Sequence, residues 1–309
     1  MPVADVLSVY LDEVVPKQAN VAKAAERITR LGEWWGAKML SEVTPKTCRE
    51  YADERTKGGA RRDLEDLRAA INHHARRNLH VGLVIVDLPP KGKAREEWLT
   101  REEVARLVWV CYRHGRTVRL PRGKNKGEVI ESTWHDLRHL ARFILFSLYT
   151  GSRSGAVLSA SIFKGPGRSY IDLENGVFYR LAEGKQETSK RQPPVRLPPR
   201  LIAHVRRWKE KGIIATHVVE WEGLPVKSIK VAWARALSLA KIKKKAPPHT
   251  LRHTAATWLM QQGVDKWEAA GFLGMSTDVL ERTYGKHHPD FMAGAASAIT
   301  RKKPRKSLP

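Results

Sequence analysis

Cysteine is almost absent from this chain of 309 residues, which contains only Cys48 and Cys111. Neither lies in a CxxC pattern, so the sequence excludes a disulfide framework and a zinc knuckle and is typical of a reducing compartment. The longest apolar run near a domain boundary, residues 83–86, is far too short to cross a bilayer. The N-terminus carries Asp5 and lacks the basic and then apolar pattern of a secretory signal. We therefore expect a cytoplasmic protein with no membrane partner.

Acidic residues are few relative to basic ones. The chain has 32 Asp and Glu against 56 Lys and Arg, which gives a formal net charge of +24. Residues 1–88 contain 14 basic and 13 acidic side chains, so nearly all of the excess lies in the remaining residues, with 42 basic and 19 acidic. A bias of this size is typical of a protein that binds nucleic acid.

Apolar residues recur at helical spacing through the first 80 residues, for example at Val3, Leu7 and Tyr10, and no strand-like alternation is present. This pattern predicts a small helical bundle over residues 1–88. Such a bundle serves either for packing alone or as a clamp on the far side of a DNA duplex, and its charge balance does not decide between them. Residues 89–98 begin Pro-Pro-Lys-Gly and are predicted to be an exposed linker.

The rest of the chain combines helices with a few strands. Thr100 and Glu103 form a capping box that predicts the start of a helix, and residues 137–148 predict a long apolar helix that ends at Thr150-Gly151. Residues 169–198 alternate around an Asn-Gly turn and predict a short antiparallel sheet. Helical segments are expected again at residues 199–212 and 226–240. The predicted fold class is mainly α with a small antiparallel β-sheet (α+β).

Residues 115–128 are rich in Arg, Lys and Gly and are predicted to form a loop. A solvated insertion is the commoner meaning of such a run. Contact with DNA phosphates is the alternative, because release of counterions there adds affinity that does not depend on sequence. The candidate DNA-binding residues are Arg116, Arg119, Arg122, Lys124 and Lys126.

Four residues in the second half of the chain have complementary chemistry for reaction at a phosphate. Arg153 follows a Thr-Gly turn, His249 and Arg252 form a His-x-x-Arg pattern, and Tyr284 ends the sequence Arg-Thr-Tyr. Guanidinium groups present paired donors to a phosphate and keep their charge. A histidine moves a proton near neutral pH, and a tyrosine hydroxyl can attack phosphorus and hold it covalently. The set predicts transfer of DNA strands without a metal or a nucleotide cofactor.

The order of these residues, with a lysine on a hairpin between the first arginine and the His-x-x-Arg pattern, resembles the tyrosine recombinase family. This family comprises the phage and prophage integrases with their Xer and Cre relatives. The set of motifs is specific, whereas any single motif would occur by chance in many proteins. The resemblance implies a catalytic domain over residues 99–292, preceded by a helical core-binding (SAM-like) DNA-binding domain over residues 1–88. Residues 293–309 would then form a basic C-terminal tail.

The resemblance also implies a mechanism and partners. Tyr284 would attack a phosphodiester of double-stranded DNA and form a 3′-phosphotyrosyl link, while Arg153 and Arg252 bind the phosphate oxygens. His249 would assist proton transfer at the nucleophile, and Lys190 would protonate the departing 5′ oxygen. Lys185 is the alternative general acid. The resemblance further implies a homotetramer on synapsed DNA, with DNA-bending accessory proteins as further partners.

Two positions depart from the family pattern. Ala156 replaces an acidic residue that normally supports the arginine equivalent to Arg153, and Met275 replaces a histidine or tryptophan. A thioether cannot donate a hydrogen bond to a phosphate oxygen, and loss of one such donor costs on the order of 3 kcal/mol in comparable sites. We expect either a slow enzyme or another donor, such as His287.

Other interpretations remain open from the sequence. His249 and His253 are spaced like a zinc-binding pair, but neither the glutamate of an HExxH motif nor a third ligand is present, so no metal is predicted. A type IB topoisomerase shares the chemistry and relaxes DNA as a monomer, although a separate helical first domain favours recombination. Ala156 and Met275 suggest a catalytically weakened DNA-binding relative, whereas the presence of Tyr284 argues against it.

Overall fold

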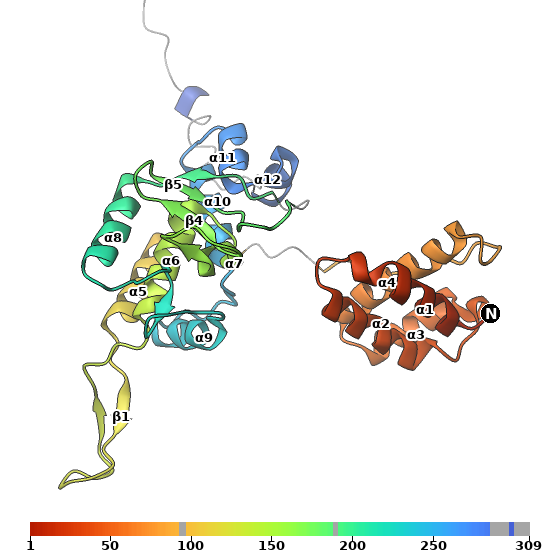
Figure 1. The fold of residues 1–309 in the computed structure, drawn as a ribbon, viewed down its shortest axis with the longest axis horizontal. Helices are drawn as coiled ribbons and strands as arrows, with labels where there is room; N and C mark the ends of the chain where they lie inside the picture. The colour runs from red at the N-terminus through yellow and green to blue at the C-terminus, as the bar shows by residue number, and fades with distance from the viewer. Residues whose placement is uncertain (93–96, 188–190, 285–296, 300–309) are drawn as a thin grey trace, which may run out of the picture. The chain divides into compact units, whose positions relative to one another are not determined.

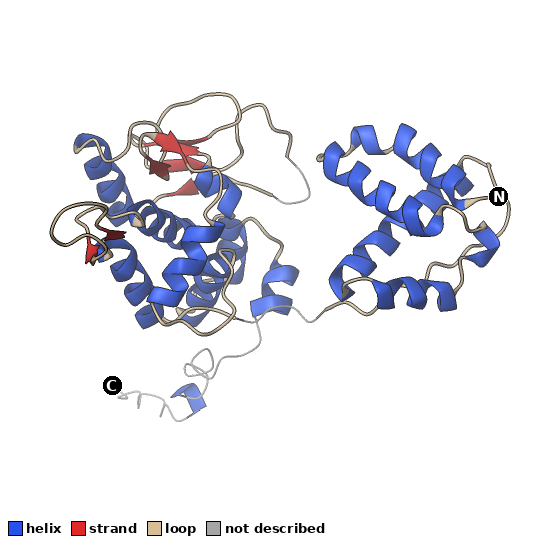
Figure 2. Cartoon of the chain, turned by 90° about the horizontal axis from the view of Figure 1, so that it is seen from below, coloured by secondary structure: helices blue, strands red, loops and turns tan. Residues whose placement is uncertain are grey.

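The computed structural model describes residues 1–92, 97–187, 191–284 and 297–299. The chain divides into two compact units, Met1–Ala94 and Arg95–Pro309. This division falls within residues 89–98, the segment that the sequence predicts as a linker. Figure 1 labels the elements along the chain, and Figure 2 shows that the first unit is built of helices whereas the second also contains strands.

The first unit is a helical bundle around one apolar core, as its periodicity predicts. The core includes Leu31, Trp35 and Leu64, all with no exposed surface. Side chains at the helix starts satisfy free backbone N–H groups, as Asn20 does for α2 and Thr44 for α3. The helices are α1 (Val3–Glu13), α2 (Val21–Trp35), α3 (Pro45–Glu54) and α4 (Lys57–Arg76), with single 3-10 turns at Val15–Lys17 and Leu40–Glu42.

The second unit is organised around α6 (Arg138–Thr150), most of whose residues are buried. Helix α5 (Arg101–Arg113) packs against it and begins at the predicted capping box, in which Thr100 and Glu103 exchange hydrogen bonds. The remaining helices are α7 (Ser154–Leu158), α8 (Pro199–Glu210), α9 (Lys230–Leu239), α10 (Thr250–Gln261), α11 (Lys266–Leu273) and α12 (Thr277–Tyr284). This arrangement confirms the predicted mainly α fold class.

A four-stranded sheet lies beside these helices in the order β3-β4-β5-β6. Its strands are β3 (Ala160–Ser161), β4 (Ser169–Asp172), β5 (Val177–Tyr179) and β6 (Val195–Arg196). The last three are antiparallel, as the alternation predicts, with Ile171 opposite Phe178 and Phe178 opposite Val195. Strand β3 pairs in parallel with β4 and was not predicted. A further short hairpin joins β7 (Glu220–Trp221) to β8 (Leu224–Pro225).

The prediction of a loop over residues 115–128 is wrong at its start, because residues 117–119 form a strand. β1 (Thr117–Arg119) pairs antiparallel with β2 (Val129–Glu131), and the ladder continues with hydrogen bonds from Leu120 N to Glu128 O and from Gly127 N to Leu120 O. Figure 1 shows this β1–β2 hairpin projecting from the second unit on the side opposite α11 and α12. Residues 121–130 are all exposed.

Each unit contains one buried free cysteine, Cys48 in the first and Cys111 in the second. Burial raises the pKa of the Cys111 thiol to about 12. Within the described part of the chain, no helix combines the length and the apolar character needed to cross a membrane.

Candidate active site

The turn that carries Arg153 is fixed by the end of α6. Gly151 adopts a left-handed conformation with φ of +59°, which stops the helix and turns the chain. A side chain at this position would also approach the Leu273 side chain to 2.5 Å, so the turn lies directly against α11. Arg153 then becomes the residue preceding α7, where its Nη1 donates to the carbonyl of Arg191 at 2.8 Å. Partial burial lowers the pKa of the Arg153 guanidinium.

Arg252 reaches the same turn from α10. Its side chain is buried, and Nη1 donates to Gly151 O at 2.8 Å. Burial, together with the nearby positive charge of Arg153, lowers the pKa of Arg252 to about 10, whereas Tyr284 opposes this effect. The structure therefore brings three of the residues predicted from the motifs, Arg153, Arg252 and Tyr284, into one electrostatic environment.

A third arginine, absent from the predicted set, joins this cluster. Arg180 follows β5 and is 3% exposed. Its Nη2 donates to Thr150 O at 2.9 Å and to Phe272 O at 2.5 Å, while Nε has no hydrogen-bond partner among the described residues. Burial lowers the pKa of Arg180 to about 9, with smaller contributions from Arg252 and Arg153. One buried guanidinium thus connects the end of α6, which leads to Arg153, with the end of α11.

Tyr284 is the last residue of α12 and points to α10. Its Oη lies 2.8 Å from Nδ1 of His253, and the two rings are 5.5 Å apart. Burial raises the pKa of the Tyr284 hydroxyl, and the positive charge of Arg252 partly opposes this. His249 precedes α10 and is exposed; its ring packs edge-on against that of His253 at 5.0 Å.

His253 is thus the described histidine that contacts the tyrosine hydroxyl, whereas the motif reasoning assigned this part of the site to His249. The sequence contained a signal for it, because His253 immediately follows Arg252 and lies one helical turn after His249. Arg180 had no comparable signal, since nothing at residue 180 indicates where β5 ends relative to the turn that carries Arg153.

The two positions that depart from the family pattern are packed into the structure without polar roles of their own. Ala156 is a buried residue of α7. Met275 follows α11 and packs against an apolar cluster that includes Leu273 and Leu280 and that Tyr284 also contacts. Where the pattern has an acid beside Arg153, this chain supplies the carbonyl of Arg191 as an acceptor.

Of the two lysine candidates, Lys185 lies among the described residues and Lys190 does not. Lys185 is exposed on the segment that leaves β5, in a turn closed by its backbone N–H donating to Ala182 O at 3.0 Å. His287, the other proposed donor, also lies outside the described residues.

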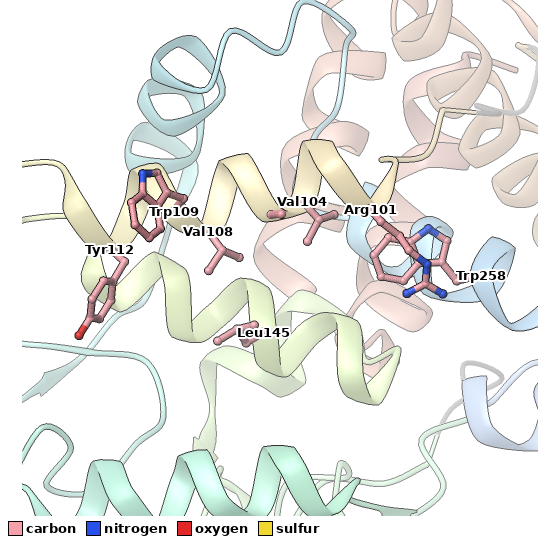
Figure 3. A pocket seen from close by; sticks show the side chains of 8 residues that line it. Arg101, Val104, Val108, Trp109, Tyr112, Leu145 and Trp258 are labelled. Carbon is pink, nitrogen blue, oxygen red and sulfur yellow. The ribbon is translucent and has the colours of Figure 1, made fainter.

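The candidate DNA-binding residues are not part of this cluster. All five are exposed on the β1–β2 hairpin, away from α12 (Figure 1). An apolar pocket of about 480 Å³ along α5 is also separate from the site. Figure 3 shows its lining, which includes Trp109, Leu145 and Trp258 and none of the predicted catalytic residues.

No group of three or more His, Cys, Asp and Glu suited to holding a metal ion occurs among residues 1–92, 97–187, 191–284 and 297–299. His249 and His253, the pair with zinc-like spacing, contact each other through their rings, and a ring nitrogen of His253 is engaged by Tyr284.

Comparisons with known proteins concern the family and the fold of this chain. Residues 130–288 match the model of the phage integrase family. No curated protein sequence matches the chain. A solved structure of the Tn1549 transposon integrase in complex with transposon right end DNA is similar, with 14% identity, a TM-score of 0.68, and coverage of 97% of this chain and 100% of that one. The lambda integrase bound to DNA is similar with 14% identity, a TM-score of 0.59, and coverage of 94% and 98%. At these identities the solved structures establish likeness of fold.

Proposed function

Because this chain belongs to the phage integrase family and is a site-specific tyrosine recombinase, we propose how its own residues cleave and rejoin double-stranded DNA. The observation that carries the proposal is the convergence of Tyr284, Arg252 and Arg153, in which each charge perturbs the pKa of a neighbour. A nucleophile beside two guanidinium groups suits attack on a phosphodiester, where negative charge grows in the transition state.

The Tyr284 oxygen attacks the scissile phosphorus and forms a 3′-phosphotyrosyl bond, and the bond from phosphorus to the 5′ oxygen breaks. Arg153 and Arg252 stabilise the charge on the non-bridging oxygens. A hairpin lysine protonates the departing 5′ oxygen; Lys190 is our first candidate and Lys185 the alternative. His249, beside His253, assists proton movement at the nucleophile. Rejoining to a partner strand reverses these steps, and the covalent bond retains the energy of the phosphodiester, so no ATP is needed.

DNA is therefore the proposed substrate and partner. The related lambda integrase forms a dimer on a COC′ core site. For this chain we propose a homotetramer on synapsed DNA, because recombination joins two duplexes of two strands each. DNA-bending accessory proteins are proposed as further partners, and the unpaired thiols of Cys48 and Cys111 support a cytoplasmic location.

The first prediction tests the nucleophile. Incubation with a library of nicked duplexes of randomised sequence should trap wild-type protein as a covalent adduct, because the short strand released at the nick diffuses away before rejoining. Tyr284→Phe should form no adduct while it still binds DNA, since only the attacking oxygen is lost. Adducts are measured as protein–DNA species that resist denaturation, and sequencing their DNA identifies the recombination site.

Two results would contradict the proposal. Wild-type protein that forms no adduct is not a strand transferase on these substrates, and a Tyr284→Phe variant that forms one uses another nucleophile. Two duplexes that carry the mapped site should then exchange strands. Relaxation of supercoils without exchange would instead indicate topoisomerase activity.

A further inference from the structure

His253 contacts the atom that reacts. Its Nδ1 lies 2.8 Å from the Tyr284 hydroxyl, within the distance over which a general base removes a proton. His249, the histidine of the His-x-x-Arg pattern, is exposed and contacts the ring of His253. His253 is therefore in direct contact with the nucleophile, and His249 packs against the ring of His253.

The tyrosine needs a group that accepts its proton. Burial of the Tyr284 hydroxyl raises its pKa, and the nearby charge of Arg252 offsets this only in part. The hydroxyl is therefore protonated at neutral pH, and a neutral phenol is a weak nucleophile. A neutral imidazole is well suited to accept such a proton near pH 7.

We infer that His253 is the general base that activates Tyr284, which deepens the proposed strand-transfer function and rests on it. When the Nε2 of His253 carries the ring hydrogen, Nδ1 accepts the hydrogen bond from Oη. The phenolic proton moves to Nδ1 as the Oη lone pair forms the bond to phosphorus. The bond to the 5′ oxygen breaks with its electron pair on that oxygen, which takes a proton from the hairpin lysine.

The reverse reaction balances in the same way. The 5′ hydroxyl of the incoming strand loses its proton to the lysine and attacks phosphorus. The bond from phosphorus to the tyrosine oxygen then breaks, and His253 returns its proton to that oxygen. The edge-on contact with His249, at a ring distance of 5.0 Å, holds the plane of the His253 ring, and it is through this positioning that His249 assists proton movement at the nucleophile.

Two substitutions separate proton transfer from a mere hydrogen bond. His253→Asn retains an acceptor oxygen near the position of Nδ1 but cannot take up a proton at neutral pH, and His253→Ala removes both properties. On substrates carrying the mapped site, each should slow adduct formation in a single turnover by about 100- to 10,000-fold, the usual contribution of a positioned base. DNA affinity, measured by gel shift, should match that of the wild type and reports that both variants fold.

Two chemical rescues show where the proton moves. Added imidazole should restore part of the rate to His253→Ala, because it can occupy the vacated space, and should leave Tyr284→Phe inactive. A substrate with sulfur in place of the departing 5′ oxygen needs no protonation of the leaving group. It should therefore leave the His253 variants slow, whereas it should restore variants of the lysine that acts as general acid.

Three outcomes would overturn the inference while leaving the proposed function intact. These are wild-type rates in His253→Asn, recovery of the His253 variants by the sulfur substrate, and a loss in His249→Asn that exceeds the loss in His253→Asn. Failure of wild-type protein to form any adduct would instead refute the proposed function itself, so the two failures are distinguishable.

Discussion

At the scale of single residues, the site brings three arginine guanidinium groups close together. The charges of Arg252 and Arg153 lower the pKa of Arg180, and that of Arg153 lowers the pKa of Arg252. Neither Arg180 nor Arg252 forms an ion pair with a carboxylate among the described residues. Buried guanidinium groups with no counter-ion are costly unless their N–H groups find acceptors. Backbone carbonyls supply those acceptors here, and a bound phosphate would supply the missing negative charge.

Arg180 gives the second prediction. Arg180→Met removes the donor shared by Thr150 O and Phe272 O, so the turn that leads to Arg153 can shift relative to α11. Displacement of a catalytic group by about 1 Å can cost on the order of 100-fold in rate, and we expect a loss of this size in adduct formation with a much smaller change in DNA affinity. Arg180→Lys should recover little, because its ammonium group ends one atom sooner than Nη2.

The matched control is Arg206→Met. Arg206 also donates from Nη2 to a carbonyl, that of Leu173 at 2.8 Å, but it is exposed and lies outside the site. Equal losses in the Arg180 and Arg206 variants would show that Arg180 has no particular role in positioning the turn that carries Arg153.

The sequence was sufficient to predict candidate site residues that lie within short motifs of characteristic composition and spacing. Arg252 and Tyr284 could be predicted to share a site because each lies within a short motif and their order along the chain is informative, and the structure brings the two together. Arg180 could not, because its importance depends on two carbonyls that are 30 and 92 residues away. His253 was visible in the sequence, but only the orientation of α12 relative to α10 makes it the partner of Tyr284.

At the scale of elements, predictions succeeded where apolar periodicity spans several residues. Helix α6 and the antiparallel strands β4, β5 and β6 follow from such patterns. Strand β3 has two residues and pairs in parallel, so it shows no alternation. The β1–β2 hairpin was missed because it is exposed on both sides and rich in charged residues, and its strands are held by backbone hydrogen bonds rather than by a buried face.

The third prediction concerns this hairpin. Replacing its five basic residues (Arg116, Arg119, Arg122, Lys124 and Lys126) with Gln should weaken DNA binding and flatten its dependence on salt. Each lost phosphate contact reduces the slope of log K against log salt by about 0.9. Thermal stability should not change, because these side chains are exposed. Binding isotherms at several salt concentrations measure the slope.

The control keeps the positive charge of the hairpin and replaces only guanidinium groups with ammonium groups. Conversion of Arg116, Arg119 and Arg122 to Lys should preserve the wild-type salt slope. An unaltered slope in the neutral variant would mean that the hairpin does not contact DNA phosphates and is a solvated insertion.

At the scale of the whole molecule, each unit has an apolar core of its own, whereas the two units differ greatly in net charge. The two apolar cores are separate, and nearly all of the excess positive charge lies after residue 88. Stability of the second unit also depends on buried groups that must stay neutral. Burial lowers the pKa of His139 to about 4, and the neighbouring charge of Arg142 contributes to this.

This pKa gives the fourth prediction. Below the ordinary histidine value of 6.5, unfolded chains take up a proton at His139 that the folded protein does not bind. Stability of the second unit should therefore fall as the pH decreases from about 6.5 to about 4, by up to about 3 kcal/mol from this residue. Denaturant unfolding between pH 7 and pH 5 should show a shallower decline in His139→Leu. Identical slopes in the two proteins would contradict the prediction.

The two buried cysteines can report on the opening of the two separate cores. Each unit carries one thiol in its interior, and burial raises the pKa of both, so little of the reactive thiolate exists in the native protein. A thiol reagent can modify Cys48 only when the first unit opens and Cys111 only when the second unit opens. The unaltered chain can therefore report, by mass spectrometry of the two labelled peptides, which of its units loosens first.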